Sequence, residues 1–203
     1  MRQWVFGTAT GFGPRRSMHS GERVWRERGL RSAVLAGDER AWQTWYEEAY
    51  AGLRAYVGWR CAGLGDLADE AVQETWLAAV RRIRSFDPER APFAAWLRGI
   101  AAHVLRNLLR RRAARAGKFL PLNGEVAADS SAEAALDSRD RAERIACALA
   151  ALPDRYEAVL QAKYLDQQSV AEMAAAWGET PKAVESLLTR ARQAFREVYL
   201  KRE

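Results

Sequence analysis

Cysteine and histidine are both scarce, with two residues of each in a chain of 203. Cys61 and Cys147 lie far apart and form no Cys-x-x-Cys spacing, so neither a disulfide framework nor a zinc site is indicated. With His19 and His103 as the only histidines, the sequence argues against a metal enzyme built on histidine ligands. We therefore expect no metal and no cofactor.

Long apolar runs are also missing. No uncharged apolar stretch approaches the roughly 18 residues that span a bilayer. The first residues also lack the charged-then-apolar layout of a secretory signal. We therefore expect no membrane insertion and a cytoplasmic location. No alternation of apolar and polar residues competes with the helical spacing described below, so the predicted fold class is all-α.

Positive charge, by contrast, is in excess. Lys and Arg number 32 against 26 Asp and Glu, which gives a net charge of +6. Hydrophobic residues make up 49% and charged residues 29%, values typical of a folded protein, and the length suits one or two domains. The charge balance hints at a polyanionic partner without identifying it.

The first part of the chain changes from an aperiodic to a helical pattern. Residues 1–28 mix glycine, aromatic residues and arginine without a sustained period, which indicates a loose N-terminal extension. Asp38 is a suitable N-cap, and bulky apolar residues recur at helical spacing from Trp42 to Val57. This pattern predicts an amphipathic helix.

A second and a third helix flank a proline-containing loop. The second is expected from Asp66, with an apolar, core-forming face that includes Trp76 and Val80. Two prolines within residues 85–92 exclude a continuous helix there. The third helix begins at Phe93 and ends in a run of arginines.

The charge reverses near residue 117. Residues 98–118 hold seven basic and no acidic residues, whereas residues 119–140 hold five acidic and one basic. This reversal, with small polar residues in the acidic part, indicates a flexible acidic linker between two small helical domains. The expected division is an N-terminal extension (1–28), a first helical domain (29–116), the linker (117–138) and a second helical domain (139–203).

The second domain carries the pattern of a helix-turn-helix. Residues 169–172 (SVAE) form a capping-box signature that opens a short helix, Gly178 turns the chain, and Thr180-Pro181 open the next helix. Such a second helix fits the major groove of DNA. The alternative is a plain helical hairpin whose charged face is only solvated. The polar positions of its second helix are Lys182, Glu185, Ser186, Thr189, Arg190 and Arg192.

Two charged clusters mark the first domain. The arginine-rich end of the third helix favours contacts with phosphate, although a solvated helix end would carry the same charges. The second helix holds an acidic and amide cluster opposite its apolar face. Because no Glu-x-x-His partner is present, a docking face for a protein is favoured over a metal or acid–base site, and simple solvation stays open. The cluster consists of Asp69, Glu70, Gln73 and Glu74.

Six short motifs follow one another along the chain. In the first domain they are residues 68–77 (ADEAVQETWL), 86–90 (FDPER) and 93–101 (FAAWLRGIA). In the second they are residues 152–153 (LP), 169–174 (SVAEMA) and 184–192 (VESLLTRAR). In this combination and order, over about residues 30–200, they resemble the bacterial RNA polymerase sigma factors of the extracytoplasmic-function group.

The resemblance implies a dissociable transcription initiation factor that catalyses no reaction itself. Its partners would be promoter DNA and core RNA polymerase, contacted at the clamp helices of the largest subunit and the flap of the second. An anti-sigma protein is a further partner that the resemblance leaves open. The residues that it assigns to polymerase binding are Asp69, Glu70, Val72, Gln73 and Glu74.

The same resemblance divides DNA recognition between the two domains. The loop after the second helix, together with the third helix, would open the minus-ten element and hold an unstacked base. The helix-turn-helix would read the minus-thirty-five element. Residues assigned to the minus-ten element are Phe86, Asp87, Pro88, Arg90, Arg98, His103, Arg106, Asn107, Arg110 and Arg111. Those assigned to the minus-thirty-five element are Ser169, Thr180, Lys182, Glu185, Ser186, Thr189, Arg190 and Arg192.

The sequence departs from the family pattern at three of these positions. His103 and Asn107 stand where many members have Asn and Asp, so the minus-ten preference of the family does not carry over. Glu185 stands where a basic residue is frequent, and a glutamate there can accept a hydrogen bond from cytosine N4. The alternative function is a stand-alone helix-turn-helix transcriptional regulator.

Overall fold

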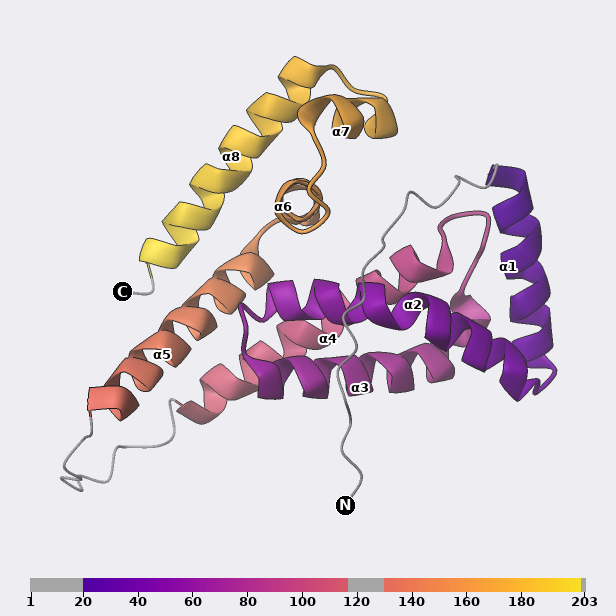
Figure 1. Ribbon diagram of the computed structural model, residues 1–203, viewed down its shortest axis with the longest axis horizontal. Coiled ribbons are helices and arrows are strands. Elements are labelled where there is room, and N and C mark those ends of the chain that lie inside the picture. The colour runs from indigo at the N-terminus through magenta and orange to yellow at the C-terminus, as the bar shows by residue number, and fades with distance from the viewer. Residues whose placement is uncertain (1–19, 117–129, 202–203) are drawn as a thin grey trace.

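The computed structural model describes residues 20–116 and 130–201, in which all regular structure is helical. This confirms the predicted all-α class. Predictions for residues 1–19 and for most of the acidic linker, residues 117–129, lie outside the described ranges. The elements are α1 (Ser20–Leu35), α2 (Glu39–Arg60), α3 (Gly65–Arg82), the short 3-10 helix η1 (Ile83–Ser85), α4 (Phe93–Ala116), α5 (Ser130–Ala151), α6 (Asp154–Tyr164), α7 (Val170–Trp177) and α8 (Pro181–Leu200) (Figure 1).

Capping residues in the sequence set several helix boundaries. Asp38 accepts a hydrogen bond from the backbone N–H of Arg40 at 2.9 Å and caps α2, as expected. Ser169 and Glu172 form the predicted reciprocal capping box at the start of α7. Gly178 ends α7 with a φ of +65°, a left-handed conformation that glycine adopts without strain.

An aromatic cluster organises the first lobe, which comprises α1 to α4. Trp45 of α2 is 2% exposed and stacks on Phe93 of α4, with ring centroids 4.2 Å apart. Phe86 meets both rings edge-on, its centroid 5.7 Å from that of Trp45 and 5.5 Å from that of Phe93. Each such aromatic pair adds about 0.5–1.5 kcal/mol beyond simple burial. The cluster therefore fixes the start of α4 and the loop before it against α2.

The second lobe, α5 to α8, packs around a smaller aliphatic core. The long helix α8 buries its Val184 and Leu187 side chains against Met173 of α7 and Val159 of α6. Helix α5 runs beside α8 and also packs against α4, with Ala146 in the core of the first lobe (Figure 1). It therefore belongs to both hydrophobic cores.

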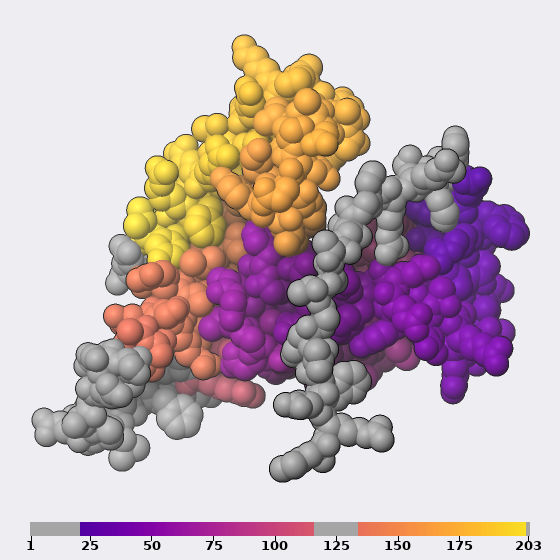
Figure 2. Space-filling model, in the orientation of Figure 1, coloured from indigo at the N-terminus to yellow at the C-terminus, as the bar shows by residue number. Residues whose placement is uncertain are grey.

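The two lobes are in contact (Figure 2), and a buried polar network joins them. Arg60, at the end of α2, is 1% exposed and pairs with Glu157 of α6 at 2.5 Å. The same guanidinium donates to the carbonyl oxygen of Leu149 at 3.1 Å, and the Tyr56 hydroxyl donates to Glu157 at 2.6 Å. Burial, with the Glu157 carboxylate nearby, raises the pKa of Tyr56 well above its ordinary value of 10.0. The phenol therefore stays protonated and remains a donor.

Three sequence expectations differ from the structure. Helix α1 begins at Ser20, so residues 20–28 are helical rather than part of a loose extension. Helix α5 begins at Ser130, so residues 130–138 are helical rather than linker. Val80, expected on the core face of α3, is 53% exposed. Periodicity failed there because α3 carries apolar residues on two faces, and only one of them packs into the core.

Candidate functional site

An apolar groove of about 1300 Å³ lies between α2 and α3. The ring of Tyr46 lies 5.1 Å from that of Tyr50 and 4.9 Å from that of Trp76, measured between centroids. Leu77 and Val80 complete the apolar lining and are about half exposed, at 48% and 53%. Contiguous exposed apolar surface rimmed by polar residues is typical of a protein interaction site.

Acidic and amide side chains of α3 border this groove. Of the five residues that the sequence assigned to polymerase binding, four line it: Asp69, Glu70, Val72 and Gln73. Glu74 is exposed on the same helix but does not line the groove. Asp69 pairs with Arg54 at 2.9 Å, and Glu70 with Arg112 at 3.4 Å. Both pairs are exposed and contribute little to stability, so the carboxylates remain available to a partner.

The loop between η1 and α4 presents only some of its assigned residues. Asp87 accepts from the backbone N–H of Glu89 at 3.0 Å, and its carbonyl oxygen accepts from the N–H of Arg90 at 3.1 Å, which closes a turn. Asp87 and Arg90 face solvent, whereas Phe86 and Pro88 are buried. Phe86 was assigned to DNA, but its ring fills the aromatic core and leaves 1% of the residue exposed. In this conformation it supports the loop rather than offering a stacking surface.

Basic and polar residues of α4 share a solvent-facing surface. His103, Arg106 and Arg110 are exposed and lie at spacings of three and four, which places them on one side of the helix. Arg110 donates to the Asn107 side chain at 2.9 Å, and Arg106 pairs with Asp154 of α6 at 3.2 Å. The other arginines assigned to this surface are Arg98, which is half-buried, and Arg111, which is exposed. The helix therefore offers a row of cations suited to a phosphate backbone.

Helices α7 and α8 form the predicted pair of helices joined by a tight turn at Gly178. The six polar positions predicted on α8 are all exposed: Lys182, Glu185, Ser186, Thr189, Arg190 and Arg192. Arg192 is already engaged, since its guanidinium donates to the Tyr164 hydroxyl at 3.0 Å and lies 5.8 Å from that ring's centroid. The exposed face has the size and chemistry of a major-groove reading helix.

Two residues assigned to the minus-thirty-five element act as helix caps. The hydroxyl oxygens of Ser169 and Thr180 accept from the backbone N–H groups of Glu172 and Ala183, each at 3.2 Å. Hydrogen bonds from the backbone and side chain of Ser169 lower the pKa of Glu172 below its ordinary value of 4.5. The two hydroxyls therefore stabilise the N-termini of α7 and α8, a structural role that does not depend on DNA.

The sequence did not single out most of the α2 side of the groove. Tyr46 and Tyr50 of α2 line it but belong to none of the six motifs. The one available signal was that apolar residues lie outside the core-facing stripe of the helix. A helix face exposed only to solvent is normally polar, so such residues indicate a second contact surface. Glu27 of α1, which binds the start of α4, was assigned to the loose extension and had no signal at all.

Within residues 20–116 and 130–201, no group of three or more His, Cys, Asp or Glu side chains is placed to hold a metal ion. Over the same ranges, none of the helices combines the length and hydropathy needed to cross a bilayer.

Both halves of the chain match models of known protein families. Residues 47–115 match the model of Sigma-70 region 2, and residues 142–195 match that of Sigma-70 region 4. The first match contains the α3 side of the groove, the loop and most of α4, and the second contains α7 and most of α8. A stand-alone regulator would need no Sigma-70 region 2, so this alternative is not supported.

The individual proteins that the chain resembles in sequence are also sigma factors. The chain is 36% identical over 132 residues to RNA polymerase sigma factor CnrH of Cupriavidus metallidurans, covering 61% of this chain and 69% of the relative. It is 32% identical over 163 residues to ECF RNA polymerase sigma factor SigF of Caulobacter vibrioides, covering 80% and 88%. The solved structure of CnrH in complex with the cytosolic domain of CnrY matches with 27% identity and a TM-score of 0.46, covering 84% of this chain and 95% of that one. The two family models and the sequence relatives show that this chain belongs to the extracytoplasmic-function group of RNA polymerase sigma factors.

Proposed function

We propose that this sigma factor binds core RNA polymerase through the groove between α2 and α3, directs it to promoters and catalyses no reaction itself. The observation that carries the proposal is the groove: an exposed, aromatic-lined surface bordered by the acidic and amide residues of the region 2 motif. A protein that acted on DNA alone would have no use for this surface. Apolar anchors surrounded by a polar rim are the usual anatomy of a protein interface.

The clamp helices of the largest polymerase subunit are the proposed occupant of the groove. Tyr46, Tyr50 and Leu77 would supply the apolar contacts, while Asp69 and Gln73 would fix the register through basic and amide groups of the partner. Helices α5 to α8 would contact the flap of the second subunit, in keeping with their region 4 match. The first lobe (α1 to α4) and the second lobe (α5 to α8) would thus dock as separate domains.

The loop and α4 are the proposed minus-ten surface. Asp87 and Arg90 project from the loop into solvent, and His103, Arg106 and Arg110 continue as a polar row along α4. Cations along such a path would follow the phosphates of an unpaired strand, and the loop would meet its bases. Phe86 and Pro88 would contribute indirectly, as buried supports of the loop.

Helix α8 is the proposed reader of the minus-thirty-five duplex. Lys182, Glu185 and Arg190 occupy exposed positions from which side chains can reach base edges or phosphates. A glutamate suits cytosine N4, and arginine suits guanine. Substituting either would change base preference at one position, whereas substituting Lys182 would weaken binding to all sequences.

The two lobes would separate when both promoter elements are bound. The elements are named for positions about 25 base pairs apart, which is about 85 Å along straight B-DNA. Arg106, on the proposed minus-ten surface, contacts Asp154 of the second lobe at 3.2 Å. The longest helix, α4, has 24 residues and is therefore only about 36 Å long. We therefore expect the molecule to fall short of this span while the lobes stay in contact.

Transcription from genomic DNA by the reconstituted holoenzyme tests the proposal. Core RNA polymerase with and without the protein would transcribe fragmented genomic DNA, and the new 5′ ends would be mapped. We expect new start sites that share one upstream sequence, and reduced transcription from all of them with an Arg190→Ala/Lys182→Ala variant. An unchanged set of start sites, together with tight DNA binding by the protein without polymerase, would contradict the proposal.

A further inference from the structure

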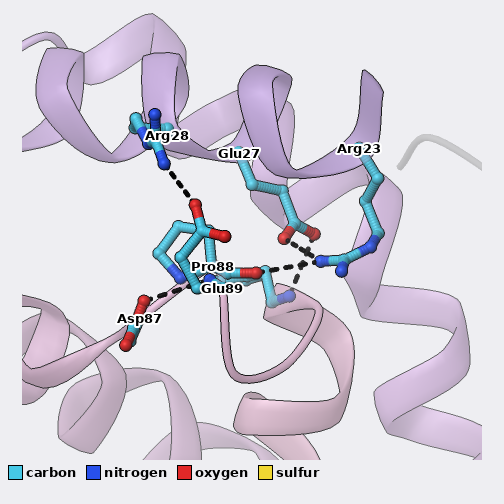
Figure 3. Close-up of polar contacts among 7 residues, drawn as sticks. Arg23, Glu27, Arg28, Asp87, Pro88 and Glu89 are labelled. Atoms are coloured by element: carbon cyan, nitrogen blue, oxygen red, sulfur yellow. Dashed lines mark hydrogen bonds and ion pairs between the residues drawn. The ribbon is translucent and has the colours of Figure 1, made fainter. Parts of the chain in front are cut away.

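Helix α1 holds the loop that precedes α4 through two charged side chains (Figure 3). One carboxylate oxygen of Glu27 accepts from the backbone N–H of Phe93 at 3.0 Å, and the other accepts from Arg23 at 3.0 Å. The same Arg23 nitrogen donates to the carbonyl oxygen of Pro88 at 3.2 Å. Glu27 is 7% exposed, so this network lies between α1 and the loop rather than on the open surface.

The contact with Phe93 caps α4 from another helix. Phe93 is the first residue of α4, and its N–H is one of the donors that a helix leaves without an internal partner. The preceding residue, Pro92, has no hydroxyl, amide or carboxylate with which to cap the helix. A carboxylate at this end is also favoured by the helix dipole. Glu27 thus supplies a cap that the loop sequence itself lacks.

Two further contacts fasten the loop, and η1 before it, to α1. Arg28 forms an ion pair with Glu89, and Arg31 donates to the carbonyl oxygen of Arg84 at 2.8 Å. Together with the Glu27 network, they hold the chain before and after Asp87, one of the exposed residues proposed to meet DNA. The loop conformation is therefore set by α1 as well as by the aromatic core beneath it.

We propose that Glu27 and Arg23 are positioning residues for recognition of the unpaired minus-ten strand, an inference that rests on the proposed function. Neither residue needs to touch DNA. By fixing Pro88 and Phe93, they hold Asp87 and Arg90 in the turn that the strand meets. A loop ordered before binding loses less conformational freedom on binding, which raises affinity without a new contact.

The experiment measures binding of a single-stranded oligonucleotide by reconstituted holoenzyme. The probe carries the minus-ten sequence of a promoter mapped with the wild-type protein, and fluorescence anisotropy gives its affinity. For Glu27→Ala we expect about a tenfold loss, which corresponds to a typical N-cap contribution. Glu27→Gln keeps an oxygen that can accept from Phe93 and should recover much of this loss. Arg23→Ala, which keeps the cap but frees Pro88, should fall between Glu27→Ala and wild type.

Arg26→Ala is the matched control, because Arg26 lies on the same helix but pairs with Glu48 of α2 rather than with the loop. Affinity for core polymerase and for minus-thirty-five duplex should stay within about twofold of wild type in every variant, because additivity holds for distant sites. The inference would be overturned if the wild-type holoenzyme binds the probe and the Glu27→Ala and Arg23→Ala variants bind it with the same affinity. An equal loss in Arg26→Ala, or a parallel loss of core affinity, would overturn it too, because it would indicate general destabilisation. Failure of the wild-type holoenzyme to bind the probe would instead refute the proposed function.

Discussion

The buried ion pair between Arg60 and Glu157 should control whether the two lobes are in contact. Arg60 is 1% exposed and Glu157 is 6% exposed, and the Arg60 guanidinium contacts Glu157 and the carbonyl oxygen of Leu149, which both belong to the second lobe. Its second terminal nitrogen is buried without a partner, so burial of this charge is incompletely compensated. We therefore expect a Glu157→Leu substitution to open the molecule rather than unfold it.

The size of the effect follows from the burial of the pair. Removing one partner of a buried ion pair costs about 3–5 kcal/mol, because the other charge is left desolvated. Separating the lobes returns Arg60 to water and avoids that cost. The ratio of open to closed molecules should therefore rise by a factor of about 10² to 10⁴. An Arg60→Met/Glu157→Leu double variant leaves no buried charge and should be close to wild type in its closed population.

Small-angle X-ray scattering, with fluorescence energy transfer between a dye on each lobe, measures this opening. The single variant should show a larger radius of gyration and lower transfer, and the double variant should show near wild-type values. Circular dichroism should report unchanged helix content in both. If the single variant is as closed as wild type, the ion pair does not control contact between the lobes and the reasoning is refuted.

Three further predictions concern the fold and the DNA surfaces. Because folding lowers the pKa of Glu172, its contribution to α7 is present above its ordinary value of 4.5 and is lost as the pH falls through the folded pKa. Amide chemical shifts of Ser169 should follow that titration, and Glu172→Gln should abolish it. Trp45→Ala should lower the free energy of unfolding of the first lobe, measured in urea, by about 3–5 kcal/mol. An unchanged free energy of unfolding would contradict the role of the indole in the core. Arg110→Ala/Arg111→Ala should reduce the logarithmic salt slope of holoenzyme–promoter binding by about 2, and an unchanged slope would exclude phosphate contacts there.

Local signals in the sequence were sufficient for much of the fold. Asp38, Ser169 and Gly178 act within a few residues of themselves, so the starts of α2 and α7 and the turn before α8 could be predicted from the residue types alone. The family motifs then indicated which helix is proposed to dock on polymerase and which is proposed to read DNA, because they combine these local signals in a fixed order. Four of the five assigned docking residues do line the groove.

Tertiary contacts account for what the sequence did not indicate. Arg60 and Glu157 are 97 positions apart, and nothing near either residue predicts a buried partner. From the sequence, Phe86 is a candidate stacking residue in a loop, but in the structure its ring packs against Trp45 and Phe93 in the aromatic core. The sequence around Glu27 resembles an extension. Its role was not predicted because its hydrogen-bond partner, Phe93, is distant in sequence. The role of each of these residues depends on tertiary contacts with residues that are distant in sequence.

Binding of the purified protein to core RNA polymerase tests most directly whether the groove between α2 and α3 is the docking surface. A Leu77→Ser/Val80→Ser variant removes two apolar side chains that are about half exposed, so the fold should tolerate it. Leu136→Ser on α5, where the leucine is 62% exposed outside the groove, is the matched control. We expect tight binding by wild type and control, and at least about a tenfold loss in the double variant. Equal affinity of all three proteins for the polymerase would contradict the account.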